Sequence, residues 1–201
     1  MLEARNITFR YGPRGPLIYD GFSFSVRPGE CIHLDAPSGF GKTTLCRLLS
    51  GYLRPLSGAV LMDGAPLPSR GACPVQLIGQ HPERVLDPRM RMQASLAEAG
   101  EVDAGLLARL GIRDEWLTRF PHELSGGEMQ RFCIARALMA RPKYLIADEI
   151  STMLDAVTQA QIWQVILEEA DAQNMGLVFT THSRPLATRL IAGGHEGTED
   201  S

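Results

Sequence analysis

The sequence DAPSGFGKTT at residues 35–44 combines glycines, a lysine and hydroxyl side chains in an order that suits phosphate binding. Glycines let a backbone approach a phosphate closely, a lysine neutralises its charge, and a threonine hydroxyl can coordinate Mg²⁺. The apolar stretch CIHL precedes this run and the helical pattern TTLCRLLSGY follows it, so the strand and helix that such a loop needs are both indicated. We therefore predict a phosphate-binding loop (P-loop) that contacts a nucleotide through Pro37, Ser38, Gly39, Phe40, Gly41, Lys42, Thr43 and Thr44.

Within this loop Lys42 is expected to reach the β- and γ-phosphates and Thr43 to bind Mg²⁺. The loop departs from the pattern GxxxxGK[ST] at the first position, where Ala36 replaces glycine. Phe40 is also bulky for such a loop. Alanine fits there if its φ is negative and is strained if its φ is positive. The alternative is a surface loop that contains a lysine by chance, but such a pattern arises in roughly 1% of random chains of this length.

A second motif, KYLIADE at 143–149, indicates a buried strand that ends in two carboxylates. Asp148 is predicted to hold Mg²⁺, directly or through water, and Glu149 to polarise the water that attacks a γ-phosphate. An acid pair after an apolar strand can also be an ordinary boundary between a strand and a loop. Its occurrence together with the P-loop favours the catalytic interpretation.

The third motif is ELSGGEMQR at 123–131, which opens the strongly helical segment MQRFCIARALMA. A serine and two backbone N–H groups at the beginning of a helix can bind an anion, and this predicts a binding role for Ser125, Gly126, Gly127 and Glu128. The alternative is a simple helix cap. A cap explains Ser125, but it does not explain two glycines that lower helix propensity where the helix begins.

These motifs, in this order and spacing, resemble the ATP-binding cassette of the ABC transporter family over about residues 2–190. The resemblance implies that LSGGE binds the γ-phosphate held by the P-loop of a second cassette, which packs head to tail against the first. It implies that the chain uses ATP and Mg²⁺, with Glu149 and His182 as catalytic residues and Thr43, Gln80 and Asp148 around the metal.

Four further residues receive roles from the same resemblance. Tyr11 in ITFRYG matches the aromatic residue that stacks on adenine, and Gln80 matches the glutamine that joins the metal and the attacking water to the helical lobe. His182 in FTTHS matches the histidine that contacts the γ-phosphate. Asp155 in STMLD matches a loop that communicates across the dimer interface, although Ser-Thr-Met stands where Thr-Ser-Ala is usual. Taken alone, the tyrosine would more often be a packing residue and the histidine a plain strand-end residue.

The stretches at 80–90, 121–128 and 159–162 are similar to the cassettes of dipeptide, oligopeptide and nickel importers. The resemblance thus implies a subunit that binds and hydrolyses ATP to power import of peptides or nickel, at the cytoplasmic face of the cell membrane. Its implied partners are the second cassette, identical or different, transmembrane permease subunits and, indirectly, a solute-binding protein.

Three alternatives remain open at this point. The chain could serve another kind of ABC transporter, or it could be a regulatory cassette that hydrolyses ATP weakly. The second is suggested by Ala36, by Phe40 and by the short stretch of 19 residues after His182. A soluble ABC protein that acts on ribosomes or DNA is a third class, but such proteins usually carry two cassettes or a long inserted coiled coil.

Composition sets the outer limits of these interpretations. The chain has 44% hydrophobic and 21% charged residues, a net charge of −3 and a pI near 6.0, which favours one core and argues against a direct nucleic-acid partner. Its four cysteines form no CxxC pair, so we expect reduced thiols and no zinc site. No apolar run approaches the roughly 18 residues that span a bilayer, so we expect other subunits to hold the chain at a membrane.

Apolar patterns predict an α/β fold, a P-loop NTPase core with a mainly parallel sheet. The expected strands are 3–9, 22–26, 30–35, 59–62, 74–79, 143–148 and 177–181, and the expected helices are 42–51, 103–110, 126–140, 157–173 and 184–191. The beginning of the chain and the hairpin-like SGAVLMDGAPL predict an antiparallel β subdomain. We predict a single domain at 1–192, with a small helical subdomain at about 82–140, and a disordered tail at 193–201.

Overall fold

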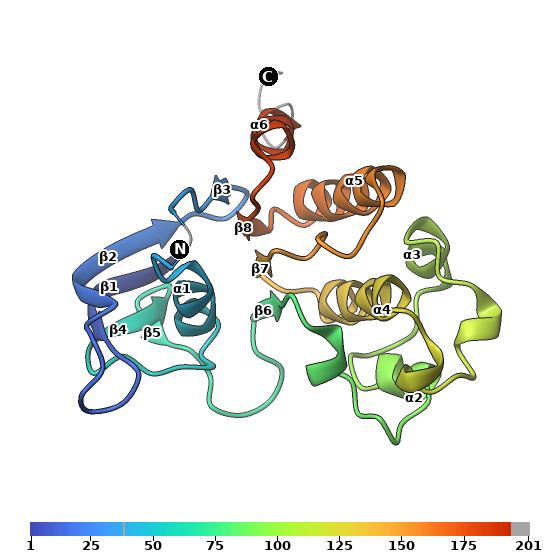
Figure 1. Cartoon of the computed structure of the whole chain (residues 1–201), viewed down its shortest axis with the longest axis horizontal. Helices are drawn as coiled ribbons and strands as arrows, with labels where there is room; N and C mark the ends of the chain where they lie inside the picture. Colours follow the sequence, from blue (N-terminus) through green and yellow to red (C-terminus); the bar gives the residue numbers. More distant parts are fainter. Residues whose placement is uncertain (38, 194–201) are drawn as a thin grey trace.

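Two β-sheets form the frame of the molecule in the computed structural model, which describes residues 1–37 and 39–193 (Figure 1). The core sheet has the strand order β3-β8-β7-β6 and its pairs are parallel. Its strands are β3 (Cys31–His33), β8 (Gly176–Thr180), β7 (Tyr144–Asp148) and β6 (Val75–Ile78). This sheet confirms the predicted parallel α/β core.

The second sheet is antiparallel and comes from the beginning of the chain, as predicted. Its order is β2 (Tyr19–Val26), β1 (Leu2–Phe9), β4 (Ser57–Met62) and β5 (Ala65–Pro66). A two-residue turn joins β4 to β5, and both of its residues, Asp63 and Gly64, have positive φ values of 52° and 79°. Aspartate and glycine tolerate this conformation, which explains the hairpin pattern in the sequence.

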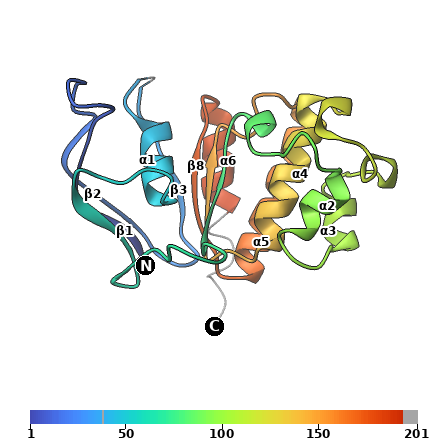
Figure 2. The ribbon, with the colours of Figure 1, turned by 90° about the horizontal axis from the view of Figure 1, so that it is seen from below.

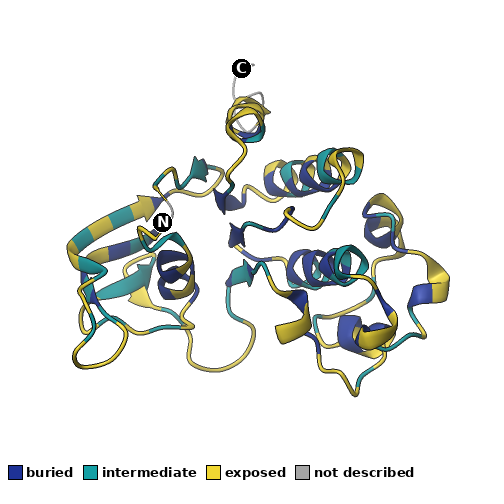
Figure 3. Ribbon diagram, viewed as in Figure 1, coloured by how far each residue is buried: buried dark blue, intermediate teal, exposed yellow. Residues whose placement is uncertain are grey.

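Alternating side chains of the core strands face two different apolar clusters. In β7, Tyr144 and Ile146 join the cluster that contains β1 and α1 (Lys42–Leu49), whereas Leu145 and Ala147 join the cluster under α4 (Gly126–Met139) and α5 (Ala156–Ala172). This is the period of two that a strand buried on both faces requires. Figure 3 accordingly shows β7 and β8 in the colour of buried residues.

Helices cover both faces of the core sheet. Helix α1 contacts β1, β6 and β7, and α4 contacts β6 from the other side. Helix α6 (Arg184–Gly193) contacts β3 and α5. Figures 1 and 2 show α1 on one side of the core strands and α4 and α5 on the other. The P-loop before α1 and the third motif before α4 are therefore presented by helices on opposite sides of the sheet.

The stretch 82–140 is helical, but it is built from shorter pieces than the sequence indicates. It contains η1 (Pro82–Arg84), α2 (Met92–Ala97), α3 (Ala104–Arg109), η2 (Asp114–Trp116) and η3 (Pro121–Glu123) before α4. The patterns predict α3 and α4 but miss α2 and the three single turns η1, η2 and η3, which show too few apolar positions for a period. Apolar residues of these pieces join the same cluster as α4, α5 and the core strands, so one core runs through both parts.

The predicted boundary between the domain and the tail differs from the structure by one residue. Gly193, which the sequence assigns to the tail, is the last residue of α6, and the predicted disorder at 194–201 lies outside the described residues. No helix in the described part of the chain is long and apolar enough to cross a bilayer.

Candidate nucleotide site

The loop between β3 and α1 turns sharply at two glycines. Gly39 has a φ of 85° and Gly41 a φ of 89°, which side chains rarely tolerate. A Cβ atom at Gly41 would also lie 2.5 Å from the Ile18 side chain. The Tyr19 hydroxyl donates to the Gly41 carbonyl at 2.9 Å, and burial, helped by Cys46 and Tyr11, raises the pKa of Tyr19 to about 12. The phenol therefore stays protonated and keeps this turn in place.

The two unusual side chains of the loop do not distort it. Positive φ values among the described residues other than glycine occur at five positions, and Ala36 is not one of them, so alanine brings no backbone strain. The Phe40 ring is 67% exposed, and the Phe40 N–H donates to the Pro37 carbonyl at 3.2 Å. Ser38, which the sequence also assigns to the loop, lies outside the described residues.

Lysine and threonine stand where a phosphate would meet them. The Lys42 ammonium donates to the carbonyls of Ala36 and, at 3.4 Å, of Pro37, so it lies against the loop. Thr43 is exposed in the first turn of α1, a helix whose first turn holds no acidic residue. Free N–H groups, a positive helix end and an ammonium group are the donors that a phosphate requires. These residues fit the predicted ligand.

Tyr11 lies beside the same helix. Its hydroxyl is 3.2 Å from the Thr44 hydroxyl, and its ring packs edge-on against Phe9 with a centroid distance of 5.0 Å. The side chain is half-exposed, so one part of the ring remains accessible. Both the packing role and the predicted stacking on adenine are compatible with this place, and the stacking stays a prediction.

The two carboxylates of the second motif lie at the carboxyl end of β7. Asp148 is 5% exposed, and its Oδ1 accepts a hydrogen bond from the Thr180 hydroxyl at 2.8 Å. Glu149 follows with a φ of 51°, a left-handed conformation that costs about 1–3 kcal/mol for a residue of this type. Strain of this kind is often found at functional sites, where the surrounding contacts hold it.

Three residues that are far apart in the sequence meet at the Glu149 carboxylate. His182 Nε2 lies 2.8 Å from Oε1, and Gln80 Nε2 donates to Oε2 at 3.3 Å. These residues follow β8 and β6, so the carboxyl ends of three parallel strands supply the group, which is the edge where ligands of open α/β sheets bind. The structure thus brings together three residues that the sequence assigned to hydrolysis.

The predicted metal site is sparse in protein ligands. No group of three or more His, Cys, Asp or Glu side chains within residues 1–37 and 39–193 has the arrangement to hold a metal ion by itself. Mg²⁺ usually takes one or two carboxylates, and water and substrate phosphates supply its other ligands. A single buried carboxylate, Asp148, with the threonine hydroxyl of Thr43 on the neighbouring α1, fits that pattern.

The third motif forms a helix cap, and its glycines also have a packing role. The Ser125 hydroxyl accepts from the Glu128 N–H at 3.3 Å, and the Glu128 carboxylate accepts from the Ser125 N–H at 2.7 Å. A Cβ atom at Gly126 would lie 2.9 Å from the Met153 sulfur, and one at Gly127 would lie 3.2 Å from the side chain of Leu154. The double glycine therefore admits the segment 151–155, a reason that the sequence did not reveal.

Asp155 caps α5 beside that motif. Its Oδ1 accepts from the N–H groups of Val157 and Thr158 at 3.0 Å each, and these hydrogen bonds, above all those of Thr158, lower the pKa of Asp155. Asp155 and the predicted residues 125–128 line one hollow of about 540 Å³. Within the described chain no hydrogen bond or ion pair joins this group to the P-loop, and Figure 2 shows α1 and α4 apart. The predicted residues thus form two separate groups.

Buried polar residues complete these groups without having been predicted. The Thr180 hydroxyl joins the Asp148 carboxylate to the backbone N–H of Glu149. The hydroxyl of Ser151 accepts from Gln159 at 2.6 Å and from the Trp163 indole at 3.3 Å. The only signal in the sequence is a hydroxyl residue next to an apolar run, which is too common to single out either position.

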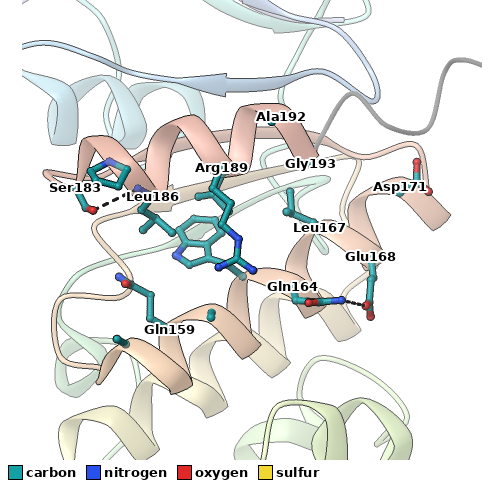
Figure 4. A pocket seen from close by; sticks show the side chains of 15 residues that line it. Gln159, Gln164, Leu167, Glu168, Asp171, Ser183, Leu186, Arg189, Ala192 and Gly193 are labelled. Carbon is teal, nitrogen blue, oxygen red and sulfur yellow. Dashed lines mark hydrogen bonds between the residues drawn. The ribbon is translucent and has the colours of Figure 1, made fainter.

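A further cleft is lined by Ala156 and Ser183, which follow the predicted residues Asp155 and His182 in the chain. It has a volume of about 840 Å³ between α5 and α6, with Leu167 and Leu186 on its walls and Gln159, Gln164 and Arg189 among its polar groups (Figure 4). None of the predicted site residues lines it.

The parallel core sheet, with a glycine-rich loop before α1, places the molecule in the P-loop class of nucleotide-binding folds. Residues 19–152 match the ABC transporter family, and the chain belongs to this family.

Two curated relatives show the range of similarity. The chain is 34% identical to the glutathione import ATP-binding protein GsiA of Pectobacterium atrosepticum, over 94% of this chain and 35% of that protein. It is 35% identical to a putative peptide import ATP-binding protein of Brucella abortus, over 81% of this chain and 55% of that protein. The chain thus spans about a third to about half of the length of these relatives.

Solved structures share the fold. A dimeric ATP-binding cassette in a post-hydrolysis state with ADP and phosphate superimposes with a TM-score of 0.79 at 20% identity, covering 96% of this chain and 91% of that chain. The ATP-binding subunit of another ABC transporter gives 0.81 at 24% identity, covering 94% and 82%. The predicted fold class is therefore confirmed.

Proposed function

We propose that this chain is the subunit of an ABC importer that binds and hydrolyses ATP. The observation that carries the proposal is the meeting of Gln80, Glu149 and His182 at the carboxyl ends of three core strands, next to the loop that begins α1. Taken singly, each of these residues could have a purely structural role. A shared contact at one carboxylate beside a P-loop is what a hydrolytic site requires.

In this proposal the loop N–H groups and Lys42 hold the β- and γ-phosphates, and Tyr11 stacks on the adenine. Glu149 orients the attacking water and accepts its proton, while His182 contacts the γ-phosphate and the nearby Glu149 Oε1. Asp148, Thr43 and Gln80 would hold Mg²⁺. Mg²⁺ bound there would supply positive charge that offsets the negative charge of the phosphates.

A second cassette completes the site in this proposal. The residues of the third motif and Asp155 line a hollow to which no described residue of the P-loop of the same chain contributes. A head-to-tail pair would place the hollow of one chain against the P-loop of the other, so that ATP lies at both interfaces. Hydrolysis would then remove the bridging γ-phosphate contacts and open the pair.

The proposed cargo is a peptide, with nickel as the second possibility from the sequence resemblance. The relatives named above are glutathione and peptide import proteins, which supports the peptide group. Permease subunits would transmit the movement, and a solute-binding protein would deliver the cargo to them. The proposed place of the chain is the cytoplasmic face of the membrane, where it would bind as a peripheral subunit.

The first test is Mg²⁺-dependent ATP turnover over a range of protein concentrations, with Glu149→Gln as the variant. We expect turnover per molecule to rise with concentration and to fall at least about a hundredfold in the variant, the scale of a lost general base. Parental turnover in Glu149→Gln would overturn the assignment of the base. Tight ATP binding without turnover at any concentration would contradict hydrolysis by the isolated chain and favour a regulatory cassette with a different partner.

A further inference from the structure

We propose that Thr180 is a positioning residue for the two carboxylates of the site, an inference that rests on the proposed ATP hydrolysis. Thr180 is the last residue of β8 and has no exposed surface. The four preceding residues of the strand are Gly176, Leu177, Val178 and Phe179. A hydroxyl in such surroundings is costly unless it is hydrogen-bonded, so its partners show what it does.

The hydroxyl of Thr180 joins two consecutive residues of the second motif. It donates to Asp148 Oδ1 at 2.8 Å and accepts from the Glu149 N–H at 3.0 Å. A hydroxyl has one hydrogen, so donating to the carboxylate leaves its lone pairs for the amide, and both bonds can exist together. The result is a directed chain from the Glu149 amide through Thr180 to the Asp148 carboxylate. Such chains strengthen each member by polarisation.

Strand pairing gives the hydroxyl a fixed place. Asp148 and Thr180 are register partners in the parallel pair of β7 and β8. Among the described residues no other hydrogen bond engages the Asp148 carboxylate, so Oδ1 is held and Oδ2 is left for a further ligand. The side chain that would hold Mg²⁺ is therefore oriented by Thr180 before any ligand arrives.

The second hydrogen bond, from the Glu149 N–H to the Thr180 hydroxyl, holds the backbone of the proposed base. Glu149 has a φ of 51°, and its partly buried N–H would lose its partner if the hydroxyl were absent. Its carbonyl accepts from the Thr152 hydroxyl at 3.2 Å, so the left-handed residue is held from both sides. This conformation directs the Glu149 carboxylate to His182 and Gln80. Thr180 thus supports both the metal ligand and the base without contacting the reacting atoms.

The test compares Thr180→Val, which keeps the shape and removes the hydroxyl, with Thr180→Ser, which keeps the hydroxyl. Ser95→Ala is the matched control, because Ser95 is buried and its hydroxyl has no partner within the described chain. All variants are compared by thermal unfolding, and Thr180→Ala replaces the valine variant if that one does not fold.

Two readouts separate positioning from a purely structural role. In Thr180→Val we expect kcat to fall about tenfold or more and the half-saturating Mg²⁺ concentration to rise by a similar factor, the worth of one hydrogen bond to a charged group. Thr180→Ser and Ser95→Ala should stay within about twofold of the parent. The second readout needs no turnover. Hydrogen exchange of the Glu149 amide, followed by NMR without nucleotide, should accelerate at least about tenfold in Thr180→Val and stay slow in Thr180→Ser.

A folded Thr180→Val protein with parental kcat, parental Mg²⁺ dependence and slow exchange at the Glu149 amide would overturn the proposal. Failure of rescue by Thr180→Ser would do the same. If the parent hydrolyses no ATP, the proposed function fails separately. Binding of a fluorescent ATP analogue with Mg²⁺ and with EDTA then decides, because loss of positioning predicts a smaller Mg²⁺-dependent gain in affinity for Thr180→Val.

Discussion

Removal of the Ser151 hydroxyl tests how the segment 151–155 is held to α5. Ser151 is 6% exposed, and its Oγ accepts from the Trp163 indole at 3.3 Å and from the Gln159 amide at 2.6 Å. Trp163 is 1% exposed, so its N–H cannot turn to water when the acceptor is lost, whereas the partly exposed Gln159 can. The main cost of Ser151→Ala is therefore one stranded indole N–H.

An unsatisfied buried donor costs about 1–3 kcal/mol, and the loss of an ordinary hydrogen bond costs about 0.5–1.5 kcal/mol. We expect Ser151→Ala to lower the free energy of unfolding by about 1–3 kcal/mol. For a chain of this size that corresponds to a fall in Tm of about 2–12 °C. Gln159→Ala is the control and should cost less than about 1 kcal/mol, because the indole keeps its acceptor.

The assay is urea unfolding of the parent, Ser151→Ala, Trp163→Phe and the double variant. Phenylalanine at 163 has no N–H to strand, so Ser151→Ala should cost at least about 0.5 kcal/mol less in that background. Additive effects would refute the argument that the indole N–H is the source of the cost. Parental stability of Ser151→Ala would refute the role of the hydroxyl altogether.

Two more predictions concern packing and burial. Burial raises the pKa of Cys31 and of Cys133 to about 12. At pH 8 iodoacetamide should therefore modify the partly exposed Cys73 first. Rapid modification of either buried thiol in the folded protein would contradict this order. Gly176→Ala should lower the free energy of unfolding by about 1–3 kcal/mol or prevent folding, because the alanine Cβ would lie 2.5 Å from the Tyr144 ring. Urea unfolding measures this free energy. A variant as stable as the parent would show that the ring can move.

The sequence predicts the elements that have a clear period or a strong punctuating residue. Strand β7, a continuous apolar run ended by two acids, and α5, with its apolar stripe and Asp155 cap, both lie where the pattern places them. Helix α2 was missed although α3, of the same length, was predicted, and the two differ in that α3 begins at the Asp103 side-chain cap whereas α2 has none. Strand β2 begins three residues earlier than predicted, at Tyr19. Pairing with β1 extends it through positions whose own pattern is weak.

Some residues of the candidate site can likewise be predicted from the sequence, whereas the contacts between them cannot. Residues with unusual chemistry at fixed spacing, such as the lysine of the P-loop, are visible in one sequence. The contacts between Gln80, Glu149 and His182 depend on which strands are neighbours, and this order is set by the whole fold. A supporting hydroxyl such as that of Thr180 is still harder to predict, because its role depends on Asp148, its partner in the register of β7 and β8.

The glycines of the third motif show how a functional pattern and a packing need can coincide. A Cβ atom at Gly126 would approach the Met153 sulfur and one at Gly127 the Leu154 side chain, so the glycines let these two side chains lie close to α4 whether or not a nucleotide binds. That segment begins directly after Ile150, which follows Glu149, and it ends at the α5 cap. A displacement of α4 would therefore be passed through Met153 and Leu154 toward the Glu149 backbone. In the proposed dimer, the surface of α4 that faces the partner would thus be connected through this segment to the proposed catalytic base of the same chain.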